Sequence, residues 1–227
     1  MLSIAGVIIV TAALTAYYAY QPNAGRIIKF RAWINNPASH PDWKLVAGSQ
    51  CGSAPFLFPT DGFAGFLWGD SFGLRRTHQG IDIFAGTDVG TTRVISAYPG
   101  YLTRLPEWKS AVIVRVPSDP LNPGQQIWLY YTHMADRYGN SFISDEFPAG
   151  TSEKLIGADV LLGYQGDYSG DPNNPVGLHL HFSIVEDDGT GQFKNELDIE
   201  NTLDPSPYLG LPLNAYENRD SAPMCDD

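Results

Sequence analysis

The chain has 227 residues, 43% of them hydrophobic, which suffices for one globular domain with a buried core. Its formal net charge of −11 argues against nucleic acid and anionic lipid surfaces as natural partners, because both are bound by basic surfaces. The 23 glycines and 17 prolines are spread along the sequence and favour many short strands joined by tight turns over long helices.

An uncharged stretch opens the sequence, from Leu2 to Tyr20. At 1.5 Å per residue its length comes close to the roughly 30 Å of a bilayer core, and the tyrosines at its end are typical of a membrane interface. We therefore expect a single transmembrane helix over residues 1–21. The alternatives are a cleaved signal peptide, for which a basic residue before the stretch and an A-x-A site after it are missing, and a helix buried in the core.

The orientation of this expected helix is open. The nearby cations Arg26, Lys29 and Arg31 follow the span, and by the positive-inside rule they would keep the domain in the cytoplasm. The chemistry described below favours the other side, and long domains can be translocated regardless of charge. We expect a single-pass membrane protein whose domain lies outside the cytoplasm, on the periplasmic or cell-wall side.

Residues 22–53 are expected to form a juxtamembrane tether, with a short amphipathic segment from Arg26 to Ile34. Cys51 lies near the end of the expected tether, and Cys225 lies in the C-terminal tail, residues 214–227. The two cysteines form no C-x-x-C motif, which disfavours a thiolate metal site. A disulfide between them and two separate thiols are equal alternatives at this point.

Residues 54–213 have the pattern of an antiparallel all-β domain, because short apolar runs alternate with turns and no βαβ order appears. The loop at residues 117–124 is expected to be a hairpin connection. The strand-like runs are residues 56–59, 66–68, 80–85, 93–97, 100–104, 111–116, 126–132, 160–165 and 178–185.

Two histidines of the last run, His179 and His181, are two residues apart and would point to the same face of a strand. Two imidazoles aimed at one point suit a metal ion or an acid–base pair, although a bare H-x-H is more often a pair of solvated side chains. Two other runs favour the functional interpretation. His78 precedes Asp82 by four residues, and a further strand ends at His133.

Together these residues fit a catalytic zinc site. Such a site usually takes three protein ligands from His and Asp or Glu and leaves a fourth position for water, whose pKa the metal lowers to about 7. The candidate ligands are His78, Asp82 and one or both of His179 and His181. The histidines that bind no metal can orient or deprotonate the water and support the charged intermediate.

Three motifs in this order, His78–Asp82, Tyr130–His133 and His179–Phe182, resemble the lysostaphin/LytM-type zinc metallopeptidases, whose signatures are H-x-G-x-D and H-L-H-F with a Tyr-x-His run between them. The resemblance covers roughly residues 54–186, and three ordered motifs are more specific than one. It implies a zinc metallopeptidase-like β domain at residues 54–213. The implied fold is an antiparallel sheet of the duplicated hybrid motif type, an open barrel-sandwich with the site in a groove.

The resemblance also implies a role for each histidine. His78, Asp82 and His181 would bind Zn²⁺, while His133 and His179 would assist the water and the intermediate. The usual substrate in the family is a peptide cross-bridge or stem peptide of peptidoglycan.

Three departures from the family pattern leave the substrate open: Ser183 stands where many members have Glu, the loop 117–124 is long, and the segment 166–175 is expanded. No ligand or helper position is lost. We therefore expect a membrane-anchored zinc endopeptidase, a hydrolase of peptidoglycan or another extracytoplasmic peptide. The alternative is a non-catalytic binding or structural subunit of a membrane complex.

Overall fold

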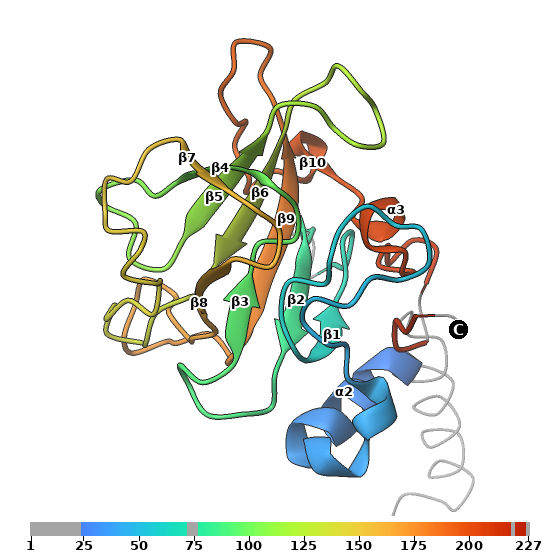
Figure 1. Cartoon of the computed structure of the whole chain (residues 1–227). Coiled ribbons are helices and arrows are strands. Elements are labelled where there is room, and N and C mark those ends of the chain that lie inside the picture. Colours follow the sequence, from blue (N-terminus) through green and yellow to red (C-terminus); the bar gives the residue numbers. More distant parts are fainter. Residues whose placement is uncertain (1–23, 72–76, 219–220, 226–227) are drawn as a thin grey trace, which may run out of the picture.

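Residues 24–71, 77–218 and 221–225 are described in the computed structural model of the chain (Figure 1). The transmembrane helix expected over residues 1–21 lies outside these described residues. Among the helices that are described, none combines the length and the hydropathy needed to cross a membrane.

Antiparallel pairing organises the domain around one sheet (Figure 1). Over the described residues this sheet has eight strands in the order β1-β2-β9-β6-β5-β4-β7, with β10 paired to β9. Its strands are β1 (Phe63–Phe66), β2 (Ile81–Phe84), β4 (Gly100–Thr103), β5 (Val112–Val116), β6 (Ile127–Thr132), β7 (Lys154–Ile156), β9 (Leu180–Glu186) and β10 (Thr202–Leu203).

A separate two-stranded sheet pairs β3 (Arg93–Ile95) with β8 (Leu161–Tyr164). Helices are few and short in the described part: α2 (Ala24–Asn35), α3 (Ser206–Leu209) and the 3-10 turns η1 (Pro37–Ser39), η2 (Pro41–Trp43) and η3 (Ile199–Asn201). The antiparallel β-sheet class predicted from the strand pattern is confirmed.

Individual strands differ from the prediction. Residues 56–59 form no strand, because their backbone N–H groups bond to three separate segments: Phe56 to Tyr208, Leu57 to Ala97 and Phe58 to Ser49. A ladder needs one continuous partner. Strands β7 and β10 were not expected, since β7 is a largely exposed edge strand and β10 has only two residues.

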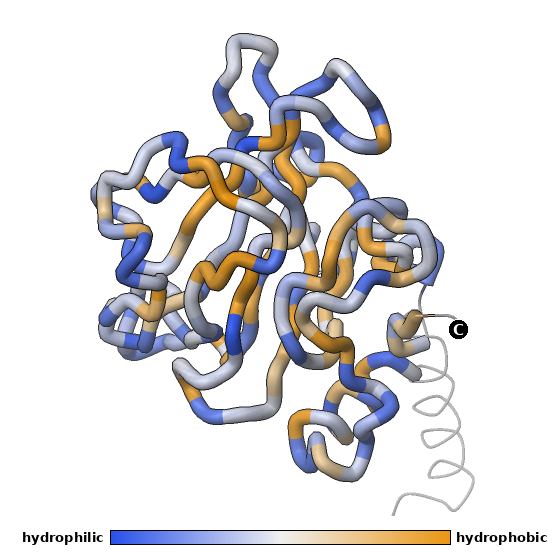
Figure 2. The backbone as a smooth tube through the Cα atoms, viewed as in Figure 1, coloured by the Kyte–Doolittle hydropathy of each residue, from blue (hydrophilic) through white to orange (hydrophobic). Residues whose placement is uncertain are grey.

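The two faces of β9 differ. Leu180, Phe182 and Ile184 are fully buried in the core, where each contributes roughly 1.5–3 kcal/mol to stability. The opposite face presents His181 at one end and Val185 at the other, where a cluster of Ile113, Trp128 and Val185, with Phe193 packed on it, covers the sheet. Figure 2 shows the hydrophobic residues concentrated along the strands. This face therefore carries an imidazole, that of His181, at one end and an apolar cluster at the other.

Helix α2, which belongs to the expected tether, packs against the sheet beside β1 (Figure 1). Trp33 is 2% exposed, and its indole N–H donates to the Phe84 carbonyl at 2.9 Å. The Phe30 ring lies 4.6 Å from that of Phe84. Over its described part, the segment 22–53 is therefore folded onto the domain.

Cys51 and Cys225 form a disulfide, with their Cα atoms 5.3 Å apart and 174 residues between them in sequence. Of the two alternatives left open by the sequence, the structure has the bonded one. A crosslink of this kind stabilises a fold by about 2–4 kcal/mol. The bond holds the C-terminal tail against the domain, and Asn218 of that tail is buried.

Candidate metal centre

Three side chains meet on the polar end of the sheet. The Nε2 atom of His78 lies 3.0 Å from Oδ1 of Asp82 and 3.1 Å from Nδ1 of His181, and that Nδ1 lies 2.8 Å from the same oxygen. These are the three residues for which the sequence predicts metal ligation. No other group of this kind occurs among the residues that the structure describes.

Strand register places two of the three. Asp82 on β2 is directly opposite His181 on β9, and opposite residues of an antiparallel pair project to the same face. On its other side His181 is paired with Thr132, the last residue of β6. His133, the next residue, is thereby brought to the same end of the sheet.

There is a steric reason for the glycine at position 80, between His78 and Asp82. A Cβ atom on Gly80 would lie 2.2 Å from the carbonyl oxygen of Phe182, far inside van der Waals contact. Only glycine allows the chain to approach β9 this closely at the start of β2. The close approach brings His78 near enough to meet His181 across the two strands.

The donor set fits zinc. Two imidazole nitrogens and one carboxylate oxygen are typical ligands of catalytic zinc. An ion with bonds of about 2.0–2.1 Å in tetrahedral geometry holds its ligand atoms roughly 3.3–3.4 Å apart. The separations of 2.8 to 3.1 Å among His78, Asp82 and His181 fall a few tenths of an ångström short of that, so a small outward movement would admit the ion.

The second nitrogen of His78 is also bound. Its Nδ1–H donates to the carbonyl of Leu67 at 3.0 Å. Because Nδ1 is held by this bond, Nε2 is the ring nitrogen that faces Asp82 and His181 and that would bind a metal ion, as in other metal-binding histidines. The role of Leu67 could not be predicted from the sequence, because a backbone carbonyl leaves no signature in the residue type.

Electrostatics keep Asp82 ionised. Burial raises the pKa of Asp82, but the neighbouring charges of His78 and His179 and the hydrogen bonds from His181 and His78 outweigh it and hold the pKa well below its usual range. Burial lowers the pKa of His78, and the attraction of Asp82 reverses this, so the net shift is upward. For His181 burial dominates and the pKa is lowered. The centre therefore offers a carboxylate and a neutral His181 to a cation.

His133 and His179 lie beside these three residues. Their ring centroids are 4.6 Å apart, and the His133 ring is 6.3 Å from that of His181. Nε2 of His179 lies 3.5 Å from Oδ1 of Asp82, and its Nδ1 is bonded to the Gly177 carbonyl. All five site residues predicted from the sequence are thus brought together, from three separate segments: residues 78–82, His133 and residues 179–181.

His133 is held in an uncommon conformation. Its φ angle is +72°, a left-handed value that is rare outside glycine and is often found at functional sites. Nδ1 of His133 donates to the carbonyl of Tyr168 at 2.7 Å. Burial, together with His179 and His181, lowers the pKa of His133 to about 3, so the ring is neutral at pH 7. Tyr168 belongs to the expanded segment 166–175, and its contact with His133 could not be predicted from the sequence.

A pocket with a volume of about 630 Å³ adjoins the centre. The ring of Phe84 joins the two, since it lies in the pocket wall and stacks on His179 at 4.9 Å. Helix α2 provides the opposite wall. The lining residues are Phe30, Arg31, Ile34, Asn35, Phe84, Gly86, Thr87, Gly177 and Leu178.

No family model matches the sequence, and no curated protein matches it. Several solved structures are similar to the chain. A mutant catalytic domain of the prophage-encoded M23 protein EnpA from Enterococcus faecalis is 19% identical, with a TM-score of 0.39, over 66% of this chain and 95% of that one.

Two other structures are named for peptidases. One, LytM of Ruminococcus gnavus, a glycyl-glycine endopeptidase by name, is 25% identical with a TM-score of 0.39 over 61% of this chain and 48% of that one, about half its length. The other, an M23 peptidase by name from Pseudomonas aeruginosa, is 16% identical with a TM-score of 0.40 over 84% of this chain and 64% of that one.

The three structures are named as M23 proteins or as LytM. At TM-scores near 0.4 the similarity assigns no role to any residue. Any role for these residues therefore rests on the geometry of the centre.

Proposed function

We propose that the chain is a zinc metalloendopeptidase with a fold of the duplicated hybrid motif type. One observation carries the proposal: donor atoms of His78, Asp82 and His181 lie within 4.8 Å of one another, with two more histidines alongside, although His181 is 103 and 99 residues from the other two in sequence. If this strand face had no function, there would be no reason for five such residues to gather from three segments.

His78 Nε2, Asp82 Oδ1 and His181 Nδ1 would hold the zinc ion. Bound there, zinc would supply a Lewis acid that activates water at neutral pH. The ionised Asp82 contributes the negative charge that compensates the cation. The hydrogen bond from His78 to Leu67 keeps that imidazole in the required tautomer.

His133 and His179 would handle the proton. With Nδ1–H of His133 donated to Tyr168, the Nε2 lone pair of this neutral ring can take a proton from the attacking water and later return it to the leaving amine. His179, whose Nε2 lies close to Asp82, is placed to orient the same water. The hydrogen bond to Tyr168 fixes the direction of the His133 ring.

The proposed substrate is a peptide of peptidoglycan, in a cross-bridge or a stem, or another extracytoplasmic peptide. The motif resemblance supports this class, and the pocket between Phe84 and α2 offers room for a substrate side chain next to the centre. We further propose that residues 1–21 anchor the chain in a membrane with the domain outside the cytoplasm. The disulfide supports this location, since such bonds persist in oxidising compartments.

The test uses the purified full-length chain. Bound zinc is measured by mass spectrometry of the metal, and hydrolysis of peptidoglycan and of a generic peptide is followed before and after removal of zinc with a chelator. Zinc near one per chain, with hydrolysis lost on chelation and regained with zinc, supports the proposal. Zinc without hydrolysis of either substrate would favour the alternative, a non-catalytic subunit, and absence of zinc contradicts both the centre and the activity.

A further inference from the structure

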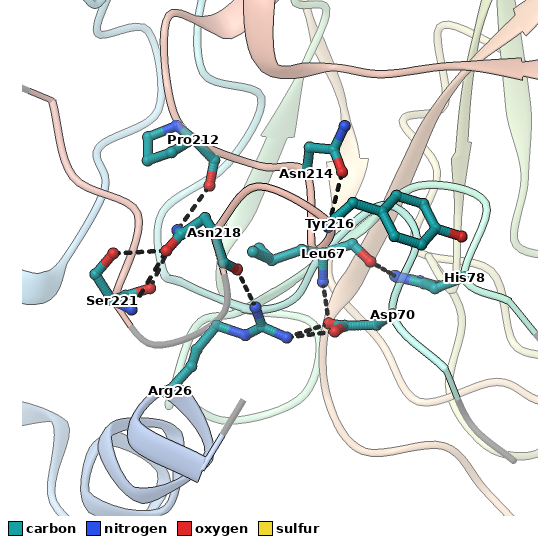
Figure 3. A network of polar contacts seen from close by, with 9 residues as sticks. All are labelled: Arg26, Leu67, Asp70, His78, Pro212, Asn214, Tyr216, Asn218 and Ser221. Atoms are coloured by element: carbon teal, nitrogen blue, oxygen red, sulfur yellow. Dashed lines mark hydrogen bonds and ion pairs between the residues drawn. The ribbon is translucent and has the colours of Figure 1, made fainter. Parts of the chain in front are cut away.

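Arg26 of helix α2 is buried, with only 1% of its surface exposed. Arginine is almost never buried this far unless it is paired. Its Nη2 donates to both carboxylate oxygens of Asp70, and its Nη1 donates to the carbonyl of Asn218 at 3.0 Å (Figure 3). Helix α2 is therefore locked to the domain by a buried, charged contact.

The carboxylate held by Arg26 organises a turn. Oδ2 of Asp70 accepts the backbone N–H of Leu67 at 2.7 Å, which closes the turn from Leu67 to Asp70. This turn holds His78 in three ways. The Asp70 carbonyl accepts the His78 backbone N–H at 2.8 Å, Gly69 donates to the His78 carbonyl at 2.8 Å, and the Leu67 carbonyl accepts from the imidazole at 3.0 Å.

A continuous chain of contacts thus runs from α2 to the metal centre: Arg26 to Asp70, Asp70 to Leu67, and Leu67 to His78 (Figure 3). Each link is buried, so each is shielded from competition by water. Without Arg26 the buried Asp70 carboxylate would lose a cationic partner, which favours rearrangement of the turn. The carbonyl that orients the His78 imidazole belongs to that turn.

We propose that Arg26 is a positioning residue for the metal centre: by holding Asp70 it fixes the turn that orients His78, so the docking of α2 sets the affinity for the metal. The inference rests on the proposed zinc centre. It gives α2 a function beyond that of a tether, because the centre reaches its full affinity only with this helix in place.

The test compares zinc affinity among folded variants of the full-length chain. Arg26→Met keeps the length of the apolar stem and removes the charge, Arg26→Lys keeps the charge, and Asp70→Asn removes the partner charge. The matched control is Arg104→Met, because Arg104 is another buried arginine and donates to the Phe147 and Trp108 carbonyls at 2.9 and 3.1 Å. Affinity is measured by competition with a chromophoric chelator, after circular dichroism has verified the fold.

Loss of an outer partner of a metal ligand typically costs about 10–100-fold in metal affinity, and this is the loss expected for Arg26→Met and Asp70→Asn. Arg26→Lys should recover part of it, and Arg104→Met should bind zinc as the native chain does. The absorption spectrum of bound Co²⁺ gives a second readout, because it reports the geometry of the metal ligands. It should change in the Arg26 variants and stay native in Arg104→Met.

If Arg26→Met does not fold, the affinity and Co²⁺ spectrum of Arg26→Lys decide. Native affinity and a native spectrum in the folded Arg26 variants overturn the inference and leave the proposed function standing. A native chain that binds no zinc overturns both. An equal loss in Arg104→Met also overturns the inference, because it would show a general effect of destabilisation.

Discussion

The candidate centre is assembled from two regions of the molecule that depend on different interactions. Asp82 and His181 are opposite neighbours in the ladder between β2 and β9, so strand pairing alone places them. His78 lies before β2 and is oriented by a turn that a buried ion pair holds to α2. The difference teaches that one half of the centre is a property of the sheet, while the other half is held by a contact between two residues that are 44 positions apart in sequence, Arg26 and Asp70.

The largest effect is expected from removing a ligand on the sheet side. His181→Ala takes away Nδ1, which lies within 3.1 Å of both other donor atoms, and should abolish zinc binding. Metal analysis after dialysis measures it. The matched control is His40→Ala, since the His40 ring stacks on Trp43 at 4.0 Å outside the centre. Native zinc content in His181→Ala would show that the ligand is misassigned.

His133→Ala separates binding from catalysis. The variant should keep its zinc, because His133 contributes no ligand atom, and should lose about 10²–10⁴-fold in rate, the usual worth of a general acid–base group. Zinc content and the rate of peptide hydrolysis are measured on the same sample. Zinc loss equal to that of His181→Ala would mean that the roles of these two histidines are wrongly divided.

The disulfide supports the contact between α2 and the domain. It ties down the tail that contains Asn218, whose carbonyl accepts from Arg26. Replacing Cys51 and Cys225 with serine should lower the free energy of unfolding by about 2–4 kcal/mol. Urea unfolding in the presence of a chelator measures the loss without a contribution from metal. A native unfolding free energy in the double variant contradicts a stabilising role for the bond.

Gly80→Ala tests how closely the two halves of the centre must approach. The added Cβ would meet the Phe182 carbonyl, and relief of such a clash typically costs about 1–3 kcal/mol of stability. Zinc affinity should fall as well, since β2 and β9 must move apart. Gly157→Ala is the control, because no atom lies within 4 Å of its added Cβ. Equal urea-unfolding midpoints for the two variants would remove the steric reason for glycine in the motif.

Part of this arrangement follows from sequence. The alternating apolar runs predicted the antiparallel sheet, and the two-residue spacing of His179 and His181 predicted a shared face. The neighbouring positions of Asp82 and His181 could not be obtained from spacing, because they depend on strand register between distant segments. That Asp82 and His181 belong to one site was indicated only by the order of the three motifs in the sequence.

The contacts that hold His78 and His133, and the packing of α2, could not be predicted from the sequence. The carbonyls of Leu67 and Tyr168 hold His78 and His133, and a backbone group is present at every position of a chain. Arg26 belongs to a segment interpreted as a tether near the membrane, where cations are ordinary. Its burial and its pairing with Asp70 arise only when α2 packs on the sheet.

Anomalous diffraction at the zinc edge, from crystals of the full-length chain grown with zinc, tests the central claim most directly. The account predicts one peak bonded to His78 Nε2, Asp82 Oδ1 and His181 Nδ1, at the distances of about 2.0–2.2 Å usual for zinc. A map without a peak among these three atoms, or with zinc bound elsewhere on the chain, would contradict it.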